Sequence, residues 1–301
     1  MSDRIRIGTR NSRLAVVQTE LVAKAMEAAS PGTEIALEAR QTTGDKILNK
    51  PLQEFGGKGV FVSEFEEGIL EGRLDLAVHS AKDMPMDLAE GLSIVGVPER
   101  EDPRDVLVSV AGRPFPESGE IVIGTSSPRR KLQIELLGKK LWPQATVRCE
   151  NLRGNVQTRL GKLESGLYDG IILAAAGLKR LGLLENDQYE FQFLECEDFI
   201  PAGGQGILAV EGRADSAAAE ILKSISHQET WLCLNLERRV LKLLDAGCHE
   251  PIGIYSRLNG GMLEVFGISG RGGRIYKTNL KGTPEQAEEL ACRAAEELGG
   301  R

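Results

Sequence analysis

Short apolar runs that alternate with helical patterns constrain this fold more than any other feature of the sequence. In the first third of the chain, strands are predicted at residues 5–8, 34–39, 74–78 and 92–97, with helices at 14–29 and 60–70. Strands separated by helices form βαβ units, in which the strands lie parallel in one sheet. The pattern therefore predicts an α/β domain with a largely parallel sheet.

A charged segment with two prolines, residues 98–105, interrupts this pattern and is interpreted as a linker or hinge. Ser127 and Pro128 are then typical of an N-cap followed by a first-turn proline, so a helix is predicted to begin there. Another helix is predicted at residues 156–163, and strands at 121–123, 146–148 and 170–174. The restarted pattern indicates a second α/β domain.

The last part of the chain has a different pattern. Two helices are predicted at residues 214–224 and 229–244, and a closing helix at 284–298. Between them, strands are predicted at 252–255, 262–268 and 275–280, joined by glycine-rich hairpin signals. This region is therefore expected to be a small α+β domain with an antiparallel sheet.

Composition excludes several classes of function. The net charge of -7 and an aromatic content of 5% argue against a nucleic-acid partner, which needs basic and stacking surfaces. The five cysteines include no CxxC pair, which argues against a disulfide framework or a zinc ribbon, and no metal site is predicted. No apolar run is suited to a signal peptide or a membrane span, so we expect a cytoplasmic protein without a membrane partner.

Arginines gather where the predicted domains would bind a ligand. Arg129 and Arg130 lie in the first turn of a predicted helix, where the helix dipole is already positive, so an anion would offset their charge. Arg10 and Ser12 follow the first strand, at the carboxyl end where open α/β sheets bind ligands. Because guanidinium groups bind carboxylates bidentately, these positions predict a substrate with several carboxylates. Surface ion pairs and a solvated basic turn are the alternatives.

Two further segments contain reactive groups. Asp83 follows a predicted buried strand, where a carboxylate can transfer protons or stabilise a cation; a structural turn aspartate is the alternative. His79 is interpreted as a packed, hydrogen-bonded residue. Cys248 lies on a predicted loop, where it could be a thiolate nucleophile or an inert thiol. The cysteines interpreted as inert are Cys149, Cys196, Cys233 and Cys292.

Nine segments, taken in order, resemble the porphobilinogen deaminase family along nearly the whole chain. They are IGTRNSRLA at 7–15, GGKGVF at 56–61, AVHSAKDMP at 77–85, EREDPRD at 99–105, GTSSPRR at 124–130, LRGNV at 152–156, AAAGLKRLG at 174–182, GQG at 204–206 and GCHEPIG at 247–253. The resemblance implies three domains, the first two similar to type II periplasmic binding proteins. The expected boundaries are residues 1–98 with 199–215, residues 103–196, and residues 219–301.

The resemblance also implies the chemistry and the residues that perform it. It implies a transferase that adds four porphobilinogen units to a dipyrromethane attached to Cys248 through a thioether, and then releases hydroxymethylbilane by hydrolysis. Asp83 matches the catalytic aspartate, and Lys58 and Phe61 match a mobile loop. The positions that match contacts to the cofactor and the growing chain are Arg10, Ser12, Ser80, Lys82, Thr125, Ser126, Ser127, Arg129, Arg130, Arg153, Arg159 and Arg180.

Three positions depart from the forms common in that family: Pro128, Gly203 and His249. Pro128 suits a first helical turn, whereas His249 would alter the surroundings of Cys248. A monomer is expected, with porphobilinogen as substrate and hydroxymethylbilane as product. Two other hypotheses are a non-enzymatic binding protein for a carboxylated small molecule and a cysteine hydrolase that uses Cys248 and His79.

Overall fold

The computed structural model describes residues 4–40, 62–247 and 250–300 of the chain. The chain divides into two compact units, one made of Met1–Glu101 with Ile207–Leu232 and the other of Asp102–Gly206 with Cys233–Arg301. Four residues with predicted roles lie outside the described residues: Lys58, Phe61, Cys248 and His249. None of the helices in the described ranges is long and apolar enough to cross a membrane.

The first unit contains a five-stranded sheet in the order β2-β1-β3-β10-β4. Its strands are β1 (Ile5–Arg10), β2 (Ile35–Arg40), β3 (Leu76–Ser80), β4 (Ser93–Gly96) and β10 (Leu208–Gly212). Helices α1 (Arg13–Ala29) and α7 (Ala217–Ile225) pack on one face of this sheet, and α3 (Ser63–Leu70) packs on the other. Strand β3 leads into a short 3-10 helix, η2 (Ala81–Asp83).

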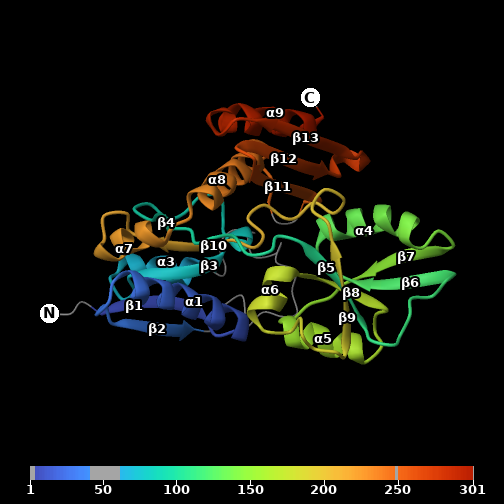
Figure 1. The fold of residues 1–301 in the computed structure, drawn as a ribbon, viewed down its shortest axis with the longest axis horizontal. Helices are drawn as coiled ribbons and strands as arrows, with labels where there is room; N and C mark the ends of the chain where they lie inside the picture. The colour runs from blue at the N-terminus through green and yellow to red at the C-terminus, as the bar shows by residue number, and fades with distance from the viewer. Residues whose placement is uncertain (1–3, 41–61, 248–249, 301) are drawn as a thin grey trace. The chain divides into compact units, whose positions relative to one another are not determined.

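The second unit contains a similar sheet in the order β7-β6-β8-β5-β9. Its strands are β5 (Asp105–Val110), β6 (Gly119–Gly124), β7 (Ala145–Glu150), β8 (Gly170–Ala174) and β9 (Tyr189–Leu194). Helix α4 (Pro128–Leu141) covers one face, while α5 (Val156–Glu164) and α6 (Ala175–Arg180) cover the other (Figure 1).

Each of these sheets is mostly parallel but contains one reversed strand. In the first sheet β10 runs antiparallel to both of its neighbours, β3 and β4, and in the second β5 runs antiparallel to β8 and β9. Strands β5, β9 and β10 were not predicted from the sequence, and Asp105, the last residue of the segment interpreted as a linker, is the first residue of the buried strand β5.

The remainder of the second unit is an antiparallel sheet, as predicted. Strands β11 (Ile252–Asn259), β12 (Met262–Ser269) and β13 (Tyr276–Gly282) pair in the order β11-β12-β13. Helix α9 (Ala287–Gly299) follows the sheet, and η3 (Arg271–Gly273) and η4 (Pro284–Gln286) are short 3-10 turns. The sheet packs against α4 through a cluster formed by Cys196, Ile200, Tyr255, Phe266, Ile268, Leu132 and Leu136. Helix α8 (Gln228–Leu243) precedes the sheet in the chain.

Candidate functional site

In the first unit, the predicted site residues lie at the carboxyl ends of two adjacent parallel strands. β1 ends at Arg10 and β3 ends at Ser80, and the two strands pair in parallel register. Lys82 and the exposed Asp83 follow in η2. The sheet therefore brings basic, hydroxyl and carboxylate side chains to one edge.

Local hydrogen bonds hold this edge in place. Ser12 is the N-cap of α1, and its Oγ accepts a hydrogen bond from the N–H of Ala15 at 3.3 Å. The buried Gln18 of α1 donates from Nε2 to Ser80 Oγ at 3.1 Å, and the N–H of Ala81 donates to the carbonyl of Ile207 at 3.0 Å. Helix α1 and the start of β10 thus fix the end of β3, directly before Asp83.

In the second unit, the hydroxyl residues Thr125, Ser126 and Ser127 shape the turn from β6 into α4. Thr125 Oγ1 accepts from the N–H of Ser127 at 3.2 Å, and Ser126 Oγ bonds both the N–H and the carbonyl of Leu152 at 3.0 Å. Ser127 caps α4 by accepting from the N–H of Arg130 at 3.4 Å, and Pro128 opens the first turn. The predicted helix start at Ser127 and Pro128 is confirmed.

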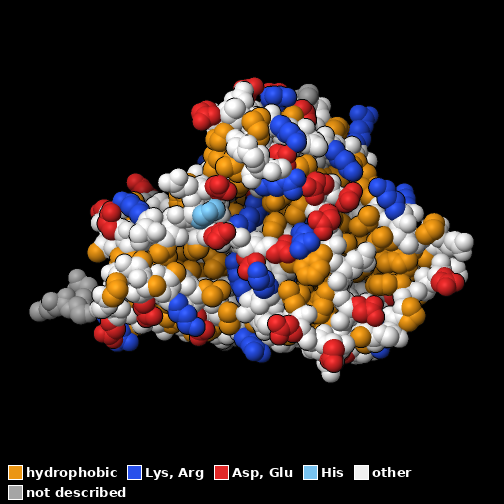
Figure 2. Space-filling view, in the orientation of Figure 1, with side chains coloured by type: hydrophobic (Ala, Val, Ile, Leu, Met, Phe, Trp, Pro, Cys, Tyr) orange, Lys and Arg blue, Asp and Glu red, His pale blue; other side chains and the backbone are white. Residues whose placement is uncertain are grey.

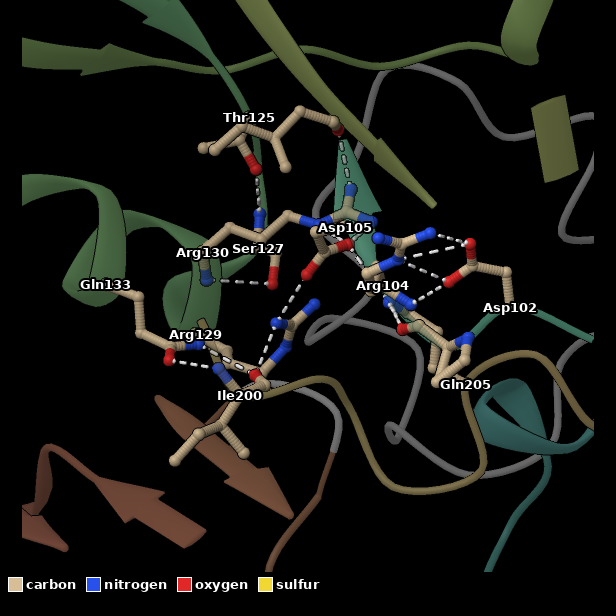
Figure 3. Close-up of polar contacts among 12 residues, drawn as sticks. Asp102, Arg104, Asp105, Thr125, Ser127, Arg129, Arg130, Gln133, Ile200 and Gln205 are labelled. Atoms are coloured by element: carbon tan, nitrogen blue, oxygen red, sulfur yellow. Dashed lines mark hydrogen bonds and ion pairs between the residues drawn. The ribbon is translucent and has the colours of Figure 1, made fainter. Parts of the chain in front are cut away.

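Arg129 and Arg130 surround a buried carboxylate, Asp105, that was not among the predicted site residues (Figure 3). Asp105 has no exposed surface, and its Oδ2 accepts from Arg129 Nη1 at 2.7 Å. Its Oδ1 accepts from Arg130 Nη2 at 2.7 Å and from Arg130 Nε at 3.1 Å. Gln205 Nε2 donates to the same oxygen at 3.1 Å. The protein itself therefore supplies an anion, Asp105, that offsets the positive charge of the first turn of α4.

Backbone carbonyls complete the surroundings of these two arginines. Arg129 Nη1 also donates to the carbonyl of Ile200 at 2.8 Å, and Arg130 Nη1 donates to the carbonyl of Ile172 at 2.7 Å. Burial lowers the pKa of Arg129, and the charge of Asp105 opposes that shift. A guanidinium stays protonated in proteins, so two positive charges face one negative charge. This cluster of Asp105, Arg129 and Arg130 retains one positive charge in excess.

The segment before β5 carries a second, more exposed ion pair. Arg104 donates to both oxygens of Asp102 and to Glu195 Oε1 at 2.9 Å, and its guanidinium lies 4.5 Å from the centre of the Phe193 ring. Burial pushes the pKa of Asp102 upward, but the hydrogen bonds and charge of Arg104 outweigh it and hold that pKa below its ordinary value. The charged segment 98–105 therefore ends in ordered contacts with β9 and the residues after it.

Arg153 and Arg159 lie near the amino-terminal side of α5, and Arg180 lies at the end of α6. Arg159 Nε donates to the carbonyl of Gly154 at 2.8 Å, and Arg180 Nη2 donates to the carbonyl of Gly206 at 2.8 Å. Arg153 is exposed beside Gly154, whose φ of 118° favours glycine. These two bonds orient the Arg159 and Arg180 side chains.

The segment from residue 201 to 206 is held by Glu237 of α8, which is itself bonded to Ser256 of β11. The N–H of Gly204 donates to Glu237 Oε2 at 2.7 Å, and the other oxygen of Glu237 accepts from the N–H and hydroxyl of Ser256. A Cβ at Gly203 would lie 2.8 Å from Leu241 Cδ1 and 2.9 Å from Ile254 Cγ2. This packing accounts for glycine here, because a larger residue requires neighbouring side chains to shift.

The described cysteines match the inert interpretation. Cys196 and Cys233 are buried, and Cys149 and Cys292 are partly buried. Burial raises the pKa of the Cys149 thiol to about 11. At neutral pH this thiol is almost entirely protonated and a weak nucleophile.

Comparison with known proteins identifies relatives along nearly the whole chain. Residues 5–221 match the family described as "Porphobilinogen deaminase, dipyromethane cofactor binding domain", and residues 231–300 match "Porphobilinogen deaminase, C-terminal domain". The chain is 44% identical to the porphobilinogen deaminase of Syntrophobacter fumaroxidans, over 99% of this chain and 95% of that protein. It is 43% identical to the porphobilinogen deaminase of Acetivibrio thermocellus, over 98% of each.

Solved structures with a similar course of the chain include a periplasmic binding protein. This is the aliphatic sulphonate binding protein SsuA from Escherichia coli, with a TM-score of 0.42 and 13% identity over 80% of this chain and 70% of that one.

Proposed function

The chain belongs to the porphobilinogen deaminase family, and from this premise we propose how its residues perform the family's reaction. The enzyme joins porphobilinogen units head to tail and releases hydroxymethylbilane by hydrolysis. Porphobilinogen carries two carboxylates and an aminomethyl group, so the site needs fixed positive charge and a carboxylate close to the departing amine. Asp83 beside Lys82, exposed at the carboxyl edge of the first sheet, is the observation that carries this proposal.

The residues of the second unit fit a dipyrromethane cofactor by the chemistry of their donors. The acetate and propionate groups of such a cofactor require cationic donors, and the Asp105 cluster keeps one positive charge in excess. Arg129 donates to Asp105 and to the carbonyl of Ile200 through Nη1, so its other N–H groups are available to bind a carboxylate. The residues proposed to hold the cofactor and the growing chain are Thr125, Ser126, Ser127, Arg129, Arg130, Arg153, Arg159 and Arg180, with Arg10, Ser12, Ser80 and Lys82 from the first unit.

Figure 2 shows basic and acidic side chains intermixed over the face it displays, in agreement with the net charge of -7. Selection of a tetracarboxylate chain therefore depends on local clusters of arginine, because the protein as a whole does not attract anions. Buried guanidinium groups suit this role, since they are weakly hydrated and bind carboxylates through two parallel N–H groups.

Cys248 is proposed to hold the cofactor through a thioether. The other four cysteines are buried or partly buried, which makes them poor attachment points for a group of this size. When bound, the dipyrromethane supplies the pyrrole carbon to which the first porphobilinogen is joined. Because the growing chain stays attached, each addition is effectively intramolecular.

Asp83 is proposed to act on the substrate. The C–N bond of the protonated aminomethyl group breaks, ammonia leaves with the bonding electrons, and the pyrrole retains a delocalised cation. A carboxylate beside this position stabilises the cation electrostatically. After the new C–C bond forms, the same carboxylate accepts the proton lost from the ring whose α-carbon attacked the cation. Lys82 and the arginines fix the carboxylates of the substrate during these steps.

Asp83→Asn tests this assignment. We expect kcat to fall by about 100-fold or more, because an amide neither accepts the proton nor carries the charge. The thermal unfolding midpoint should not change, since Asp83 is exposed. Asp87→Asn, a second exposed aspartate a few residues along, is the matched control and should keep normal turnover. Normal turnover in Asp83→Asn would remove Asp83 from the mechanism.

Membership of this family argues against the hypotheses of a non-enzymatic binding protein and of a cysteine hydrolase. The monomeric state, the cytoplasmic location and the domain boundaries stay predictions of the sequence.

A further inference from the structure

One glutamine of α4 has no part in the proposed chemistry but is as deeply buried as the two arginines before it. Gln133 is 2% exposed, compared with 4% for Arg129 and 7% for Arg130. Because Gln133 lies four residues after Arg129, the two side chains are on the same face of the helix. A buried amide is costly unless its polar atoms are hydrogen-bonded. The partners of Gln133 therefore show what this side chain holds in place.

Both polar atoms of the Gln133 amide bind the backbone of Ile200 (Figure 3). Its Oε1 accepts from the N–H of Ile200 at 2.6 Å, and its Nε2 donates to the carbonyl of Ile200 at 2.8 Å. The side chain therefore binds one residue at two points, through one bond in each direction. Such a pair of bonds fixes both the position and the orientation of the Ile200 backbone.

The carbonyl of Ile200 is also a partner of Arg129. It accepts from Arg129 Nη1 at 2.8 Å in addition to the bond from Gln133, so both of its lone pairs are used. Arg129 Nη1 carries two hydrogens, and it also donates to Asp105 Oδ2 at 2.7 Å. A guanidinium is planar and rigid, so two fixed acceptors on Nη1 determine the directions of its other N–H groups. The orientation of Arg129 therefore depends on where the Ile200 carbonyl is held.

The other side of residues 200–201 contacts the start of β11. The N–H of Ile254 donates to the carbonyl of Pro201 at 3.0 Å. A Cβ at Gly253 would lie 2.7 Å from the carbonyl oxygen of Ile200 and 3.1 Å from that of Pro201, so this close approach requires glycine. Gly253 is the last residue of the segment GCHEPIG, which also contains Cys248. The backbone that Gln133 holds is therefore in contact with both α4 and the strand that follows Cys248 in the chain.

We propose that Gln133 is a positioning residue of the reaction and that it acts on Arg129 through the Ile200 carbonyl. By holding this carbonyl, the amide fixes the direction in which Arg129 presents its other N–H groups to the carboxylates of the cofactor and the growing chain. The side chain must also be neutral. Gln133 Nε2 and Arg129 Nη1 bind the same oxygen, so a carboxylate in place of the amide pairs with Arg129 and cancels the excess positive charge of the cluster. This inference rests on the proposed role of Arg129 in binding the cofactor.

Gln133→Met and Gln133→Glu, made in the full-length chain, test this role. Both variants remove the donor to the Ile200 carbonyl, but only Gln133→Glu keeps an acceptor for the Ile200 N–H and adds a charge. Intact mass gives the share of chains that carry the cofactor, and kcat is measured per loaded chain. We expect kcat to fall about 10-fold in Gln133→Met and further in Gln133→Glu, with fewer loaded chains in the second variant. The unfolding midpoint should fall more in Gln133→Met, so activity and stability rank the two variants in opposite order.

Ile134→Val, at the next position of α4, is the matched control. Ile134 is fully buried in the core of the second sheet, so its truncation should lower the unfolding midpoint and leave kcat and the share of loaded chains unchanged. An unchanged kcat in Gln133→Met, or a kcat in Gln133→Glu equal to or above that of Gln133→Met, would overturn the proposal. A wild-type chain that carries no cofactor, even after incubation with porphobilinogen, would instead contradict the proposed function, and the role of Gln133 would be lost with it.

Discussion

The two α/β sheets have the same strand arrangement, and each buries a carboxylate on its one reversed strand. In the second sheet this is Asp105 of β5, bound by Arg129 and Arg130. In the first sheet it is Glu211 of β10, bound by His79. Both carboxylates have no exposed surface. A buried carboxylate on the reversed strand is thus bound by two arginines in one sheet and by a histidine in the other.

The difference matters because arginine and histidine respond differently to pH. A guanidinium keeps its charge at every pH at which the protein is folded, so the Asp105 cluster is a constant source of positive charge. Burial raises the pKa of Glu66 of α3, so the helix that covers the first sheet holds a carboxylate whose charge depends on pH. The second sheet is therefore suited to binding a polycarboxylate, and the first to holding a strand end whose neighbours take part in proton transfer.

The largest expected effect comes from removing the charge of Asp105. Asp105→Asn leaves two buried guanidinium groups without their counterion, and breaking such a pair costs about 3–5 kcal/mol of the free energy of unfolding. Urea unfolding measures this loss, with the exposed Asp187→Asn as control. Glu211→Gln should cost much less, because its neutral amide can still accept from His79. Equal losses in the two variants would remove the distinction between the sheets.

A smaller effect is expected from Gln205, which adds a neutral donor to Asp105. Gln205→Ala removes the bonds to Asp105 Oδ1 and to the carbonyl of Pro103, but it leaves both arginines in place. We expect a loss of about 1–3 kcal/mol, the usual range for an unmet hydrogen bond to a buried group. A loss as large as that of Asp105→Asn would show that Gln205, rather than charge, dominates the cluster.

The smallest effect concerns the pH dependence of the first sheet. The pKa of Glu66 is raised above its ordinary value of 4.5, chiefly by burial and then by Glu211, while Ala89 and His79 oppose the shift. The stabilisation from protonated Glu66 is complete below pH 4.5 and is lost as pH rises through the raised pKa. Glu66→Gln lacks this dependence.

The free energy of unfolding should therefore fall with rising pH in the wild-type protein relative to Glu66→Gln. Parallel stability curves for the two proteins between acid and neutral pH would mean that Glu66 titrates alike in the folded and unfolded chains.

The sequence predicted the elements that local patterns determine. The α/β alternation, the cap and first-turn proline of α4, and the three antiparallel strands of the last region all depend on residues close together in the chain. The reversed strand β5 was missed, because its pairing with β8 and β9 depends on residues far along the sequence. Its first residue, Asp105, also ends the charged segment that was interpreted as a linker, although the residues that follow, 106–110, form a largely apolar run.

The site could be predicted only in part for the same reason. The basic turn at Arg129 and Arg130 indicated that an anion lies nearby, but Asp105 is 24 and 25 residues away in the chain. The segment EREDPRD at 99–105 contains this aspartate, but nothing in the neighbouring residues indicates which side chains it binds. Glu211 gave no signal, because a single glutamate in a short apolar run does not reveal whether it is buried or which side chains it meets.

The intact mass of the purified chain, measured beside a Cys248→Ser variant, tests the central claim most directly. The account predicts a mass above that of the sequence by two linked pyrrole units in the wild-type protein, and no excess in the variant. A wild-type mass equal to that of the sequence, unchanged after incubation with porphobilinogen, would contradict it.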